Sequence, residues 1–142
     1  EKFMKMKVVL EKGAKVSRAH ETDAGLDLYS RDEQRRTILP GGSATFDTGV
    51  HVELPKGTMG LIFSKSGLNV KSGLTSEGII DEGYTGSIKV KLYNHSRNRY
   101  EVKCGDKISQ LIVVPIVIPE LEYVDKLEET ERGSNGFGSS GR

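Results

Sequence analysis

The stretch GIIDEGYTGSIKVKLYN, residues 78–94, decides the fold class of this sequence. Two isoleucines precede an acidic residue and a Gly-Tyr turn signal, and a second run rich in Ile, Val and Tyr follows directly. Two short strand-like runs on either side of a glycine-containing turn predict a β-hairpin. Hairpins joined by short turns are typical of antiparallel, all-β proteins.

Other apolar stretches in the chain are equally short and are also rich in β-branched residues. Turn sequences separate them, namely LPGGS (39–43), LPKGT (54–58) and GYTG (83–86). Further strands are predicted for MKMKVVL (4–10), ATFDTGVHVEL (44–54), TMGLIF (58–63) and ISQLIVVPIVI (108–118). We therefore expect an all-β sandwich or jelly roll, with one short helix beginning near Ser66.

Length and charge narrow the classes of function. The 142 residues fit one domain with a core of its own. With 21 basic and 20 acidic side chains the net charge is +1, so no overall field attracts nucleic acid or an anionic membrane, and we expect neither as a partner. The single cysteine, Cys104, excludes a disulfide framework and suits a reducing cytosol. A cytoplasmic enzyme or binding protein is the expectation.

Composition changes at about Thr130, where a glycine- and serine-rich segment begins. We predict a β domain over residues 1–130 and a flexible arm over residues 131–142. Arg132 offers a planar fork suited to phosphate, and Phe137 among glycines suits a flat partner such as a nucleobase. The arm is therefore predicted to fold over a nucleoside polyphosphate.

Asp81 and Tyr84 are the strongest candidates for chemistry. A carboxylate that follows two isoleucines at a hairpin edge has a partly apolar setting, which favours a role as general base. The ring of Tyr84 offers a flat surface for a sugar or a base. The alternative is a hairpin in which Asp81 and Gly83 only shape the turn.

Three other stretches combine glycine or serine with polar side chains. In DAGLDLYS (23–30), Asp27 lies between two leucines, for which a solvated strand carboxylate is the ordinary explanation. SKSGL (64–68) could present backbone N–H groups and a positive charge to phosphate, or form a plain turn. In GDKISQLIVVP (105–115), the amide of Gln110 serves either the backbone or a ligand. The histidines, His20, His51 and His95, are too far apart to suggest a metal site, and surface or strand-edge roles are expected.

Together, AGLDLYS, SKSGL, GIIDEGYTG, GDKISQLIVVP and RGSNGFGSSG resemble, in order and spacing, the five motifs of the trimeric dUTP nucleotidohydrolase (dUTPase) family. The resemblance implies a β jelly-roll (β-clip) fold and a homotrimer whose sites are shared between subunits. It also implies Mg²⁺-dependent hydrolysis of dUTP to dUMP and pyrophosphate, which limits uracil incorporation into DNA and supplies dUMP.

The resemblance also assigns roles to residues. Asp81 corresponds to the carboxylate that activates water for attack on the α-phosphate, Tyr84 to the ring under the deoxyribose, and Asp27 to an acidic residue that acts on the metal through water. The uracil pocket corresponds to the hairpin residues Thr75, Gly78, Ile79 and Ile80. Phosphate or substrate contacts correspond to Lys65, Ser66, Gly67, Lys89 and Gln110. The arm residues implied are Arg132, Phe137, Gly138 and Ser139.

The sequence departs from the family pattern at three positions, with Lys65 in place of arginine, Ser64 in place of proline and Asn135 in place of glycine. One alternative is a dCTP deaminase-like enzyme of the same fold, but Lys91 stands where that family carries a glutamate. The other is a nucleotide-gated protein that binds a regulatory protein partner.

Overall fold

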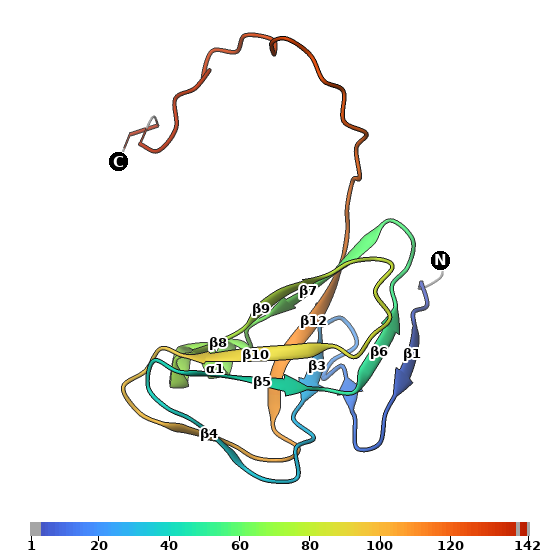
Figure 1. The fold of residues 1–142 in the computed structure, drawn as a ribbon, viewed down its shortest axis with the longest axis vertical. Helices are drawn as coiled ribbons and strands as arrows, with labels where there is room; N and C mark the ends of the chain where they lie inside the picture. Colours follow the sequence, from blue (N-terminus) through green and yellow to red (C-terminus); the bar gives the residue numbers. More distant parts are fainter. Residues whose placement is uncertain (1–3, 139, 142) are drawn as a thin grey trace.

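Figure 1 shows the computed structural model of the protein, which describes residues 4–138, 140 and 141. The all-β prediction is confirmed, because β-strands and one short helix make up the regular structure of these residues. The strands are β1 (Lys7–Leu10), β2 (Val16–Ser17), β3 (Gly25–Tyr29), β4 (Arg36–Ile38), β5 (Ser43–Asp47), β6 (Val50–Glu53), β7 (Thr58–Phe63), β8 (Leu74–Thr75), β9 (Glu77–Ile80), β10 (Lys89–Asn94), β11 (Tyr100–Val102) and β12 (Lys107–Pro115), and the helix is α1 (Ser66–Ser72).

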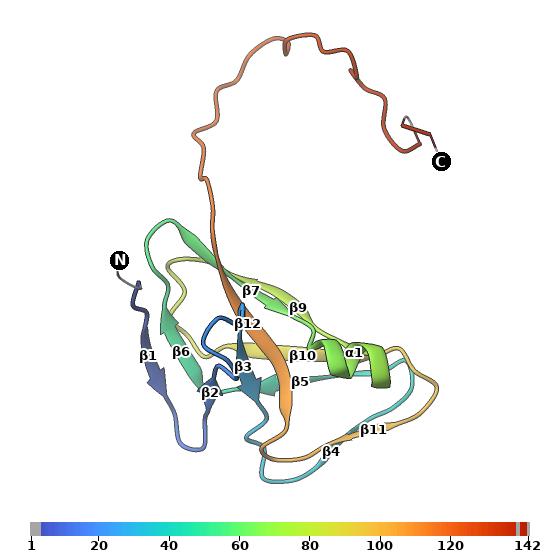
Figure 2. The ribbon, with the colours of Figure 1, turned by 180° about the vertical axis from the view of Figure 1, so that it is seen from behind.

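The largest sheet has five strands in the order β2-β3-β12-β7-β9, and every neighbouring pair in it is antiparallel. A second sheet has the order β5-β10-β8, and two-stranded sheets join β1 to β6 and β4 to β11. Figures 1 and 2 show the β1–β6 ribbon at one end of the body, and α1 with the β4–β11 ribbon at the other.

Strand β12 lies between β3 and β7 and sets their register. Gln110 is opposite Asp27 of β3 and opposite Phe63 of β7, and Phe63 is in turn opposite Glu77 of β9. Lys65 follows Phe63 by two residues, and Gly78 follows Glu77 directly, so both lie close to this row. The pairing therefore gathers parts of four separate sequence motifs at one edge of the fold.

Buried apolar side chains fill the space between the five-stranded sheet and the β5–β10 layer. Leu28 and Leu111 from the first sheet and Phe46 and Val90 from the second are all fully buried and belong to one cluster. Burial of side chains of this size contributes roughly 1.5–3 kcal/mol each. This core holds both layers. The hairpin predicted over residues 78–94 is wrong, because β9 pairs with β7 whereas β10 pairs with β5 and β8 in a different sheet, and the turn over residues 81–88 connects the two sheets.

Local sequence signals located some elements well and others poorly. TMGLIF corresponds to β7, and α1 begins at Ser66 as predicted. The stretch 44–54, predicted as one strand, is two strands in different sheets. The break falls at Gly49, whose φ of 71° ends β5 and allows β6 to turn toward β1.

After β12 the chain leaves the body. The amide of Ile116 still donates to the Gly57 carbonyl at 2.9 Å, and the described residues beyond it are exposed and extend away from the sheets (Figures 1 and 2). The division of the chain at residue 130 stays a prediction. No helix in residues 4–138 is long and apolar enough to cross a membrane.

The break at Gly49 generates a stability prediction. A Cβ at residue 49 would lie 2.6 Å from Cζ of Arg31, whereas one at Gly57, which has a similar φ of 78°, meets nothing within 4 Å. We expect Gly57→Ala to destabilise the fold by about 1–2 kcal/mol, the cost of a left-handed alanine. Gly49→Ala should cost about 1–3 kcal/mol more, because Arg31 must abandon its hydrogen bonds.

Urea unfolding followed by circular dichroism measures both variants. If Gly49→Ala and Gly57→Ala lower the free energy of unfolding equally, Gly49 is not required to make room for the Arg31 side chain.

Candidate active site

A cavity of about 250 Å³ lies at the turn that connects β9 to β10. Five residues predicted from the sequence and one that was not, Ser87, line it, and the full set is Ile79, Ile80, Asp81, Tyr84, Ser87 and Lys89. The structure thus brings together the predicted base, the predicted ring and part of the predicted uracil pocket. We call this cavity the hairpin pocket, after the hairpin that the sequence predicted over residues 78–94.

The turn from Asp81 to Ser87 is held by its own residues. The amide of Tyr84 donates to the Asp81 carbonyl at 3.0 Å, and the Tyr84 hydroxyl donates to the Ser87 carbonyl at 2.8 Å. Gly86 permits this arrangement, because a Cβ there would lie 2.5 Å from the Tyr84 hydroxyl oxygen. The ring of Tyr84 is therefore fixed across the turn while remaining 42% exposed.

Neighbouring segments support the turn from two sides. The Glu82 carboxylate accepts a hydrogen bond of 2.9 Å from the Gly57 amide. The Ser87 hydroxyl donates to Asp47 and accepts from the Gly49 amide at 3.0 Å. The hydrogen bond from Ser87 lowers the pKa of the Asp47 carboxyl. Asp81 itself is exposed at the mouth of the hairpin pocket, where water and a ligand can reach it.

Asp27 is buried, with 2% of its surface exposed, so the interpretation as a solvated strand carboxylate is wrong. Because β3 is covered on both faces, alternation along the strand does not expose this side chain. Its carboxylate pairs with the ammonium of Lys65 and, at 3.3 Å, with that of Lys107. Lys107 was not among the predicted site residues, although it lies in the stretch that contains Gln110. We call these three residues the Asp27 cluster.

The side chains of Gln110 and Ser64 serve the backbone. Gln110 Nε2 donates to the Ser64 carbonyl at 2.8 Å, which favours the first of the two roles predicted for this amide. The Ser64 hydroxyl accepts from the Ser76 amide at 2.9 Å and donates to the Ser76 carbonyl at 3.2 Å. Serine in place of the family's proline therefore joins the end of β7 to the segment before β9.

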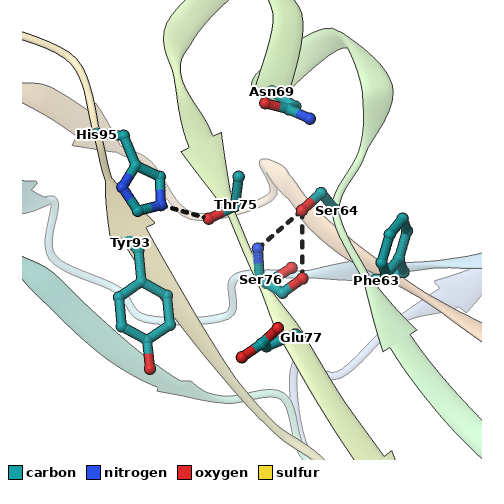
Figure 3. Close-up of a pocket in the computed structure, with 8 residues that line it drawn as sticks. All are labelled: Phe63, Ser64, Asn69, Thr75, Ser76, Glu77, Tyr93 and His95. Carbon is teal, nitrogen blue, oxygen red and sulfur yellow. Dashed lines mark hydrogen bonds between the residues drawn. The ribbon is translucent and has the colours of Figure 1, made fainter. Parts of the chain in front are cut away.

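A larger cavity, of about 530 Å³, lies elsewhere, between the end of β7, α1, β8 and β10 (Figure 3). Thr75 lines this cavity and not the hairpin pocket, and its hydroxyl contacts His95 Nε2 at 2.8 Å. The rings of His95 and Tyr93 stack with centroids 6.2 Å apart. The structure therefore separates Thr75 from Ile79 and Ile80. Gly78 lies on β9 over Ile62.

A magnesium site made of protein ligands alone does not fit the described residues. No group of three or more His, Cys, Asp or Glu side chains in residues 4–138 is arranged to hold a metal. Asp27 is a single carboxylate already paired with two ammonium groups. A Mg²⁺ ion here would be held mainly by phosphates and water, which is how proteins usually bind this ion, and the role of Asp27 at the metal stays a prediction.

The described arm residues do not reach the hairpin pocket or the Asp27 cluster of the same chain. Arg132 donates from Nε to the Asn135 carbonyl at 2.8 Å, within the arm itself. Phe137 is fully exposed, and Gly138 follows it at the end of the extended segment (Figures 1 and 2). Ser139 lies outside the described residues. Ser66 and Gly67 are exposed at the start of α1, next to the Asp27 cluster in sequence.

Comparisons with known proteins agree with this geometry. A family model described as dUTPase matches residues 11–141. The deoxyuridine 5'-triphosphate nucleotidohydrolase of Clostridium tetani is 40% identical over 142 residues, which cover 98% of this chain and 97% of the relative. The corresponding protein of Gloeothece citriformis is 43% identical over 143 residues, 97% of each chain.

Solved structures show the same fold. A Staphylococcus bacteriophage 80alpha dUTPase with dUPNHPP has a TM-score of 0.87 at 33% identity, over 97% of this chain and 99% of that one. A mutant dUTPase from phage phi11 of S. aureus, described with a structural Mg(II) ion, has a TM-score of 0.79 at 30% identity, over 89% and 100% of the two chains. The resemblance in the five motifs is confirmed along nearly the whole chain, which therefore belongs to the dUTPase family.

Proposed function

We propose that this chain hydrolyses dUTP to dUMP and pyrophosphate, with Asp81 as the general base in the hairpin pocket. Family membership supports the reaction. The observation that carries the assignment of the site is that Asp81, Tyr84, Ile79 and Lys89 line one pocket. A carboxylate, a flat ring and a strand with an exposed edge are the groups needed to activate water and to hold a nucleoside.

In this proposal Asp81 accepts a proton from a water molecule as that water attacks the α-phosphorus, and pyrophosphate leaves. Tyr84 packs under the deoxyribose, where the ring leaves no room for a 2′-hydroxyl. The backbone of β9 around Gly78, Ile79 and Ile80 reads the edge of uracil as a base-pairing partner would, and Lys89 contacts the substrate from β10. The fixed Tyr84–Ser87 hydrogen bond supports this arrangement, because a pre-positioned ring costs little entropy on binding.

The phosphates bind at SKSGL, through Lys65, Ser66 and Gly67, with Gln110 beside them. The Asp27 cluster carries two ammonium groups for one carboxylate, so a local positive charge faces this region. A Mg²⁺ ion bound to the triphosphate would supply charge neutralisation, and Asp27 would act on it through water. Little else is required of the protein, since phosphoryl-type displacement depends mainly on positioning and neutralisation.

The separation of these parts supports a homotrimer with shared sites. The residues that line the hairpin pocket include none of the Asp27 cluster, and the described arm lies away from both. The segment after β12 also exposes a series of apolar side chains, which a neighbouring subunit would cover. These side chains are Val117, Ile118, Leu121, Tyr123, Val124 and Leu127.

In the trimer the arm closes over a neighbouring site. Arg132 clamps the γ-phosphate, Phe137 stacks on uracil, and Gly138 and Ser139 approach the phosphates with their backbone. The protein works in the cytoplasm on free nucleotides.

The two alternatives have less support. A deaminase would need a carboxylate at residue 91, where Lys91 is exposed with its ammonium 5.1 Å from the Tyr93 ring centre. For the 80alpha phage protein, control of the transfer of virulence genes by a G protein-like mechanism is described. A regulatory partner of this chain could coexist with catalysis, and the assay below separates an enzyme from a pure binder.

The reaction is tested by incubating the protein with dUTP, dTTP, dCTP and UTP in the presence of Mg²⁺. We expect pyrophosphate release from dUTP and at least about a hundredfold slower release from the other three. Ammonia from dCTP would establish the deaminase instead, and binding of dUTP without any product would establish a pure binder.

Replacement of Asp81 by asparagine tests the base. We expect Asp81→Asn to bind a non-cleavable dUTP analogue nearly as well as the unmodified protein, while turnover falls about a hundredfold or more. Glu82→Gln is the matched control, because the glutamine oxygen can still accept the Gly57 hydrogen bond. Turnover that survives Asp81→Asn would remove this residue from the mechanism.

Deletion of the chain after Glu131 tests the arm. The shortened protein should remain trimeric by light scattering, because the apolar segment between residues 117 and 127 is retained. Turnover should fall at least about tenfold, since a clamp over the phosphates is lost. Full activity in the shortened protein would mean that the arm is only a tail. If the unmodified protein were a monomer, the site could not be shared between subunits.

A further inference from the structure

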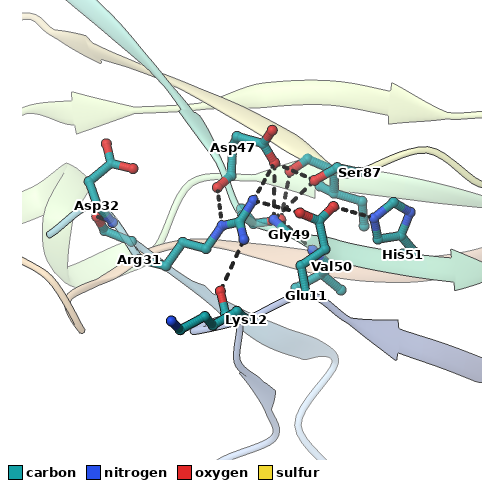
Figure 4. Close-up of polar contacts among 12 residues, drawn as sticks. Glu11, Lys12, Arg31, Asp32, Asp47, Gly49, Val50, His51 and Ser87 are labelled. Atoms are coloured by element: carbon teal, nitrogen blue, oxygen red, sulfur yellow. Dashed lines mark hydrogen bonds and ion pairs between the residues drawn. The ribbon is translucent and has the colours of Figure 1, made fainter.

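His51 on β6 bridges two segments that are far apart in the sequence, and Figure 4 shows its contact with one of them, Glu11. Its Nε2 atom lies 2.6 Å from Oε2 of Glu11, and its Nδ1 atom lies 2.8 Å from the carbonyl oxygen of Thr85. Thr85 directly follows Tyr84 in the turn that carries Asp81. Both ring nitrogens of one half-buried histidine are thus used, one of them on the turn of the hairpin pocket.

Both partners of His51 are acceptors. A backbone carbonyl cannot donate, and the Glu11 carboxylate also accepts from the Arg31 guanidinium at 3.1 Å. Hydrogen bonds from His51 and Arg31 lower the pKa of the Glu11 carboxyl, so this group remains ionised. A neutral imidazole has only one N–H group, and in that form one of the two contacts would place a lone pair against an oxygen. The observed geometry therefore requires the imidazolium.

Glu11 is itself anchored to the body. Arg31 contacts its carboxylate, donates to the Lys12 carbonyl at 3.1 Å and reaches Asp47 at 3.3 Å. Asp47 in turn accepts from the Ser87 hydroxyl at the other end of the turn. Figure 4 shows Glu11, Arg31, Asp47 and Ser87 converging on one another. The turn is thus held at Ser87 through Asp47 and at Thr85 through His51.

We infer that His51 is a positioning residue for the reaction: as an imidazolium it ties Thr85 to Glu11 and so holds the turn that presents Asp81 and Tyr84. This inference rests on the proposed function of the hairpin pocket. His51 does not touch the substrate in this scheme. Loss of its proton frees either Thr85 or Glu11 and loosens the turn.

The direction of the pH dependence follows from the contacts. The Glu11 carboxylate and the Thr85 carbonyl raise the pKa of His51. The bridge is therefore complete below the ordinary histidine pKa and is lost as the pH rises through the raised pKa. The other charged groups near the ring are Asp47 on β5, Arg31 after β3, Lys7 on β1 and Glu53 on β6.

Nuclear magnetic resonance of the ¹⁵N-labelled protein tests the bridge without reference to activity. We expect the His51 ring to titrate above the ordinary histidine midpoint of about 6.5 and the backbone amides of Thr85 and Gly86 to shift with the same midpoint. Glu11→Gln should move that midpoint to lower pH. The inference would be overturned if the His51 ring titrated with an ordinary midpoint, or if the amides of Thr85 and Gly86 did not shift with that midpoint.

Activity measurements then test the positioning role. The kcat for dUTP of the unmodified protein should decline at alkaline pH, with the midpoint found for His51. His51→Gln should lower kcat at neutral pH by roughly fivefold, the loss expected from one hydrogen bond, and should abolish that alkaline decline. His20→Gln is the control, since His20 is exposed and contacts only Asp23, and it should keep the pH profile of the unmodified protein.

The two hypotheses fail in different ways. A His51→Gln variant with an unchanged pH profile would refute the role of His51 and leave the hydrolase assignment intact. Absence of pyrophosphate from dUTP with the unmodified protein at every pH would refute the proposed function, while the resonance titration would still decide whether the bridge exists.

Discussion

The antiparallel pairing of β12 with both β3 and β7 is the constraint on which the site depends. It places Asp27, Gln110 and Phe63 in one row, and the residues that follow Phe63 are those of the SKSGL motif. Because side chains alternate between the two faces of a sheet, a register slip of one residue would move Asp27 away from Lys65. The register of β12 with its two neighbours therefore decides which motifs meet.

Two different kinds of support hold the two parts of the site. The Asp27 cluster is an ionic arrangement, in which a buried carboxylate keeps the ammonium groups of Lys65 and Lys107 close together. Breaking such a pair is costly because the remaining charge is left without a partner. The turn between β9 and β10, in contrast, is mostly exposed and is held by neutral and charged hydrogen bonds through Ser87 and Thr85. In the proposed reaction the first part anchors the phosphates, and the second presents a pre-positioned ring to the nucleoside.

Local patterns in the sequence predicted the elements that depend on neighbouring residues. β7 and the start of α1 follow from β-branched content and from a Ser-Gly turn, and the hairpin pocket follows from a run of consecutive residues. The burial of Asp27 and the contact of His51 with Thr85 did not follow, because both join residues more than thirty positions apart. The strand predicted over residues 44–54 failed for the same reason, since each half pairs with a different partner. Chemical roles within the site came from the family resemblance and not from spacing.

The segment that leaves the body after Pro115 has a kinetic consequence. A fully extended chain from residue 117 to residue 138 spans about 70 Å, which is more than the width of a small domain. Its tip, with Phe137 fully solvated, is covalently tethered, so it meets any surface within this radius at a local concentration of roughly millimolar. Closure of such a tether is a first-order event, and its rate does not change when the protein is diluted.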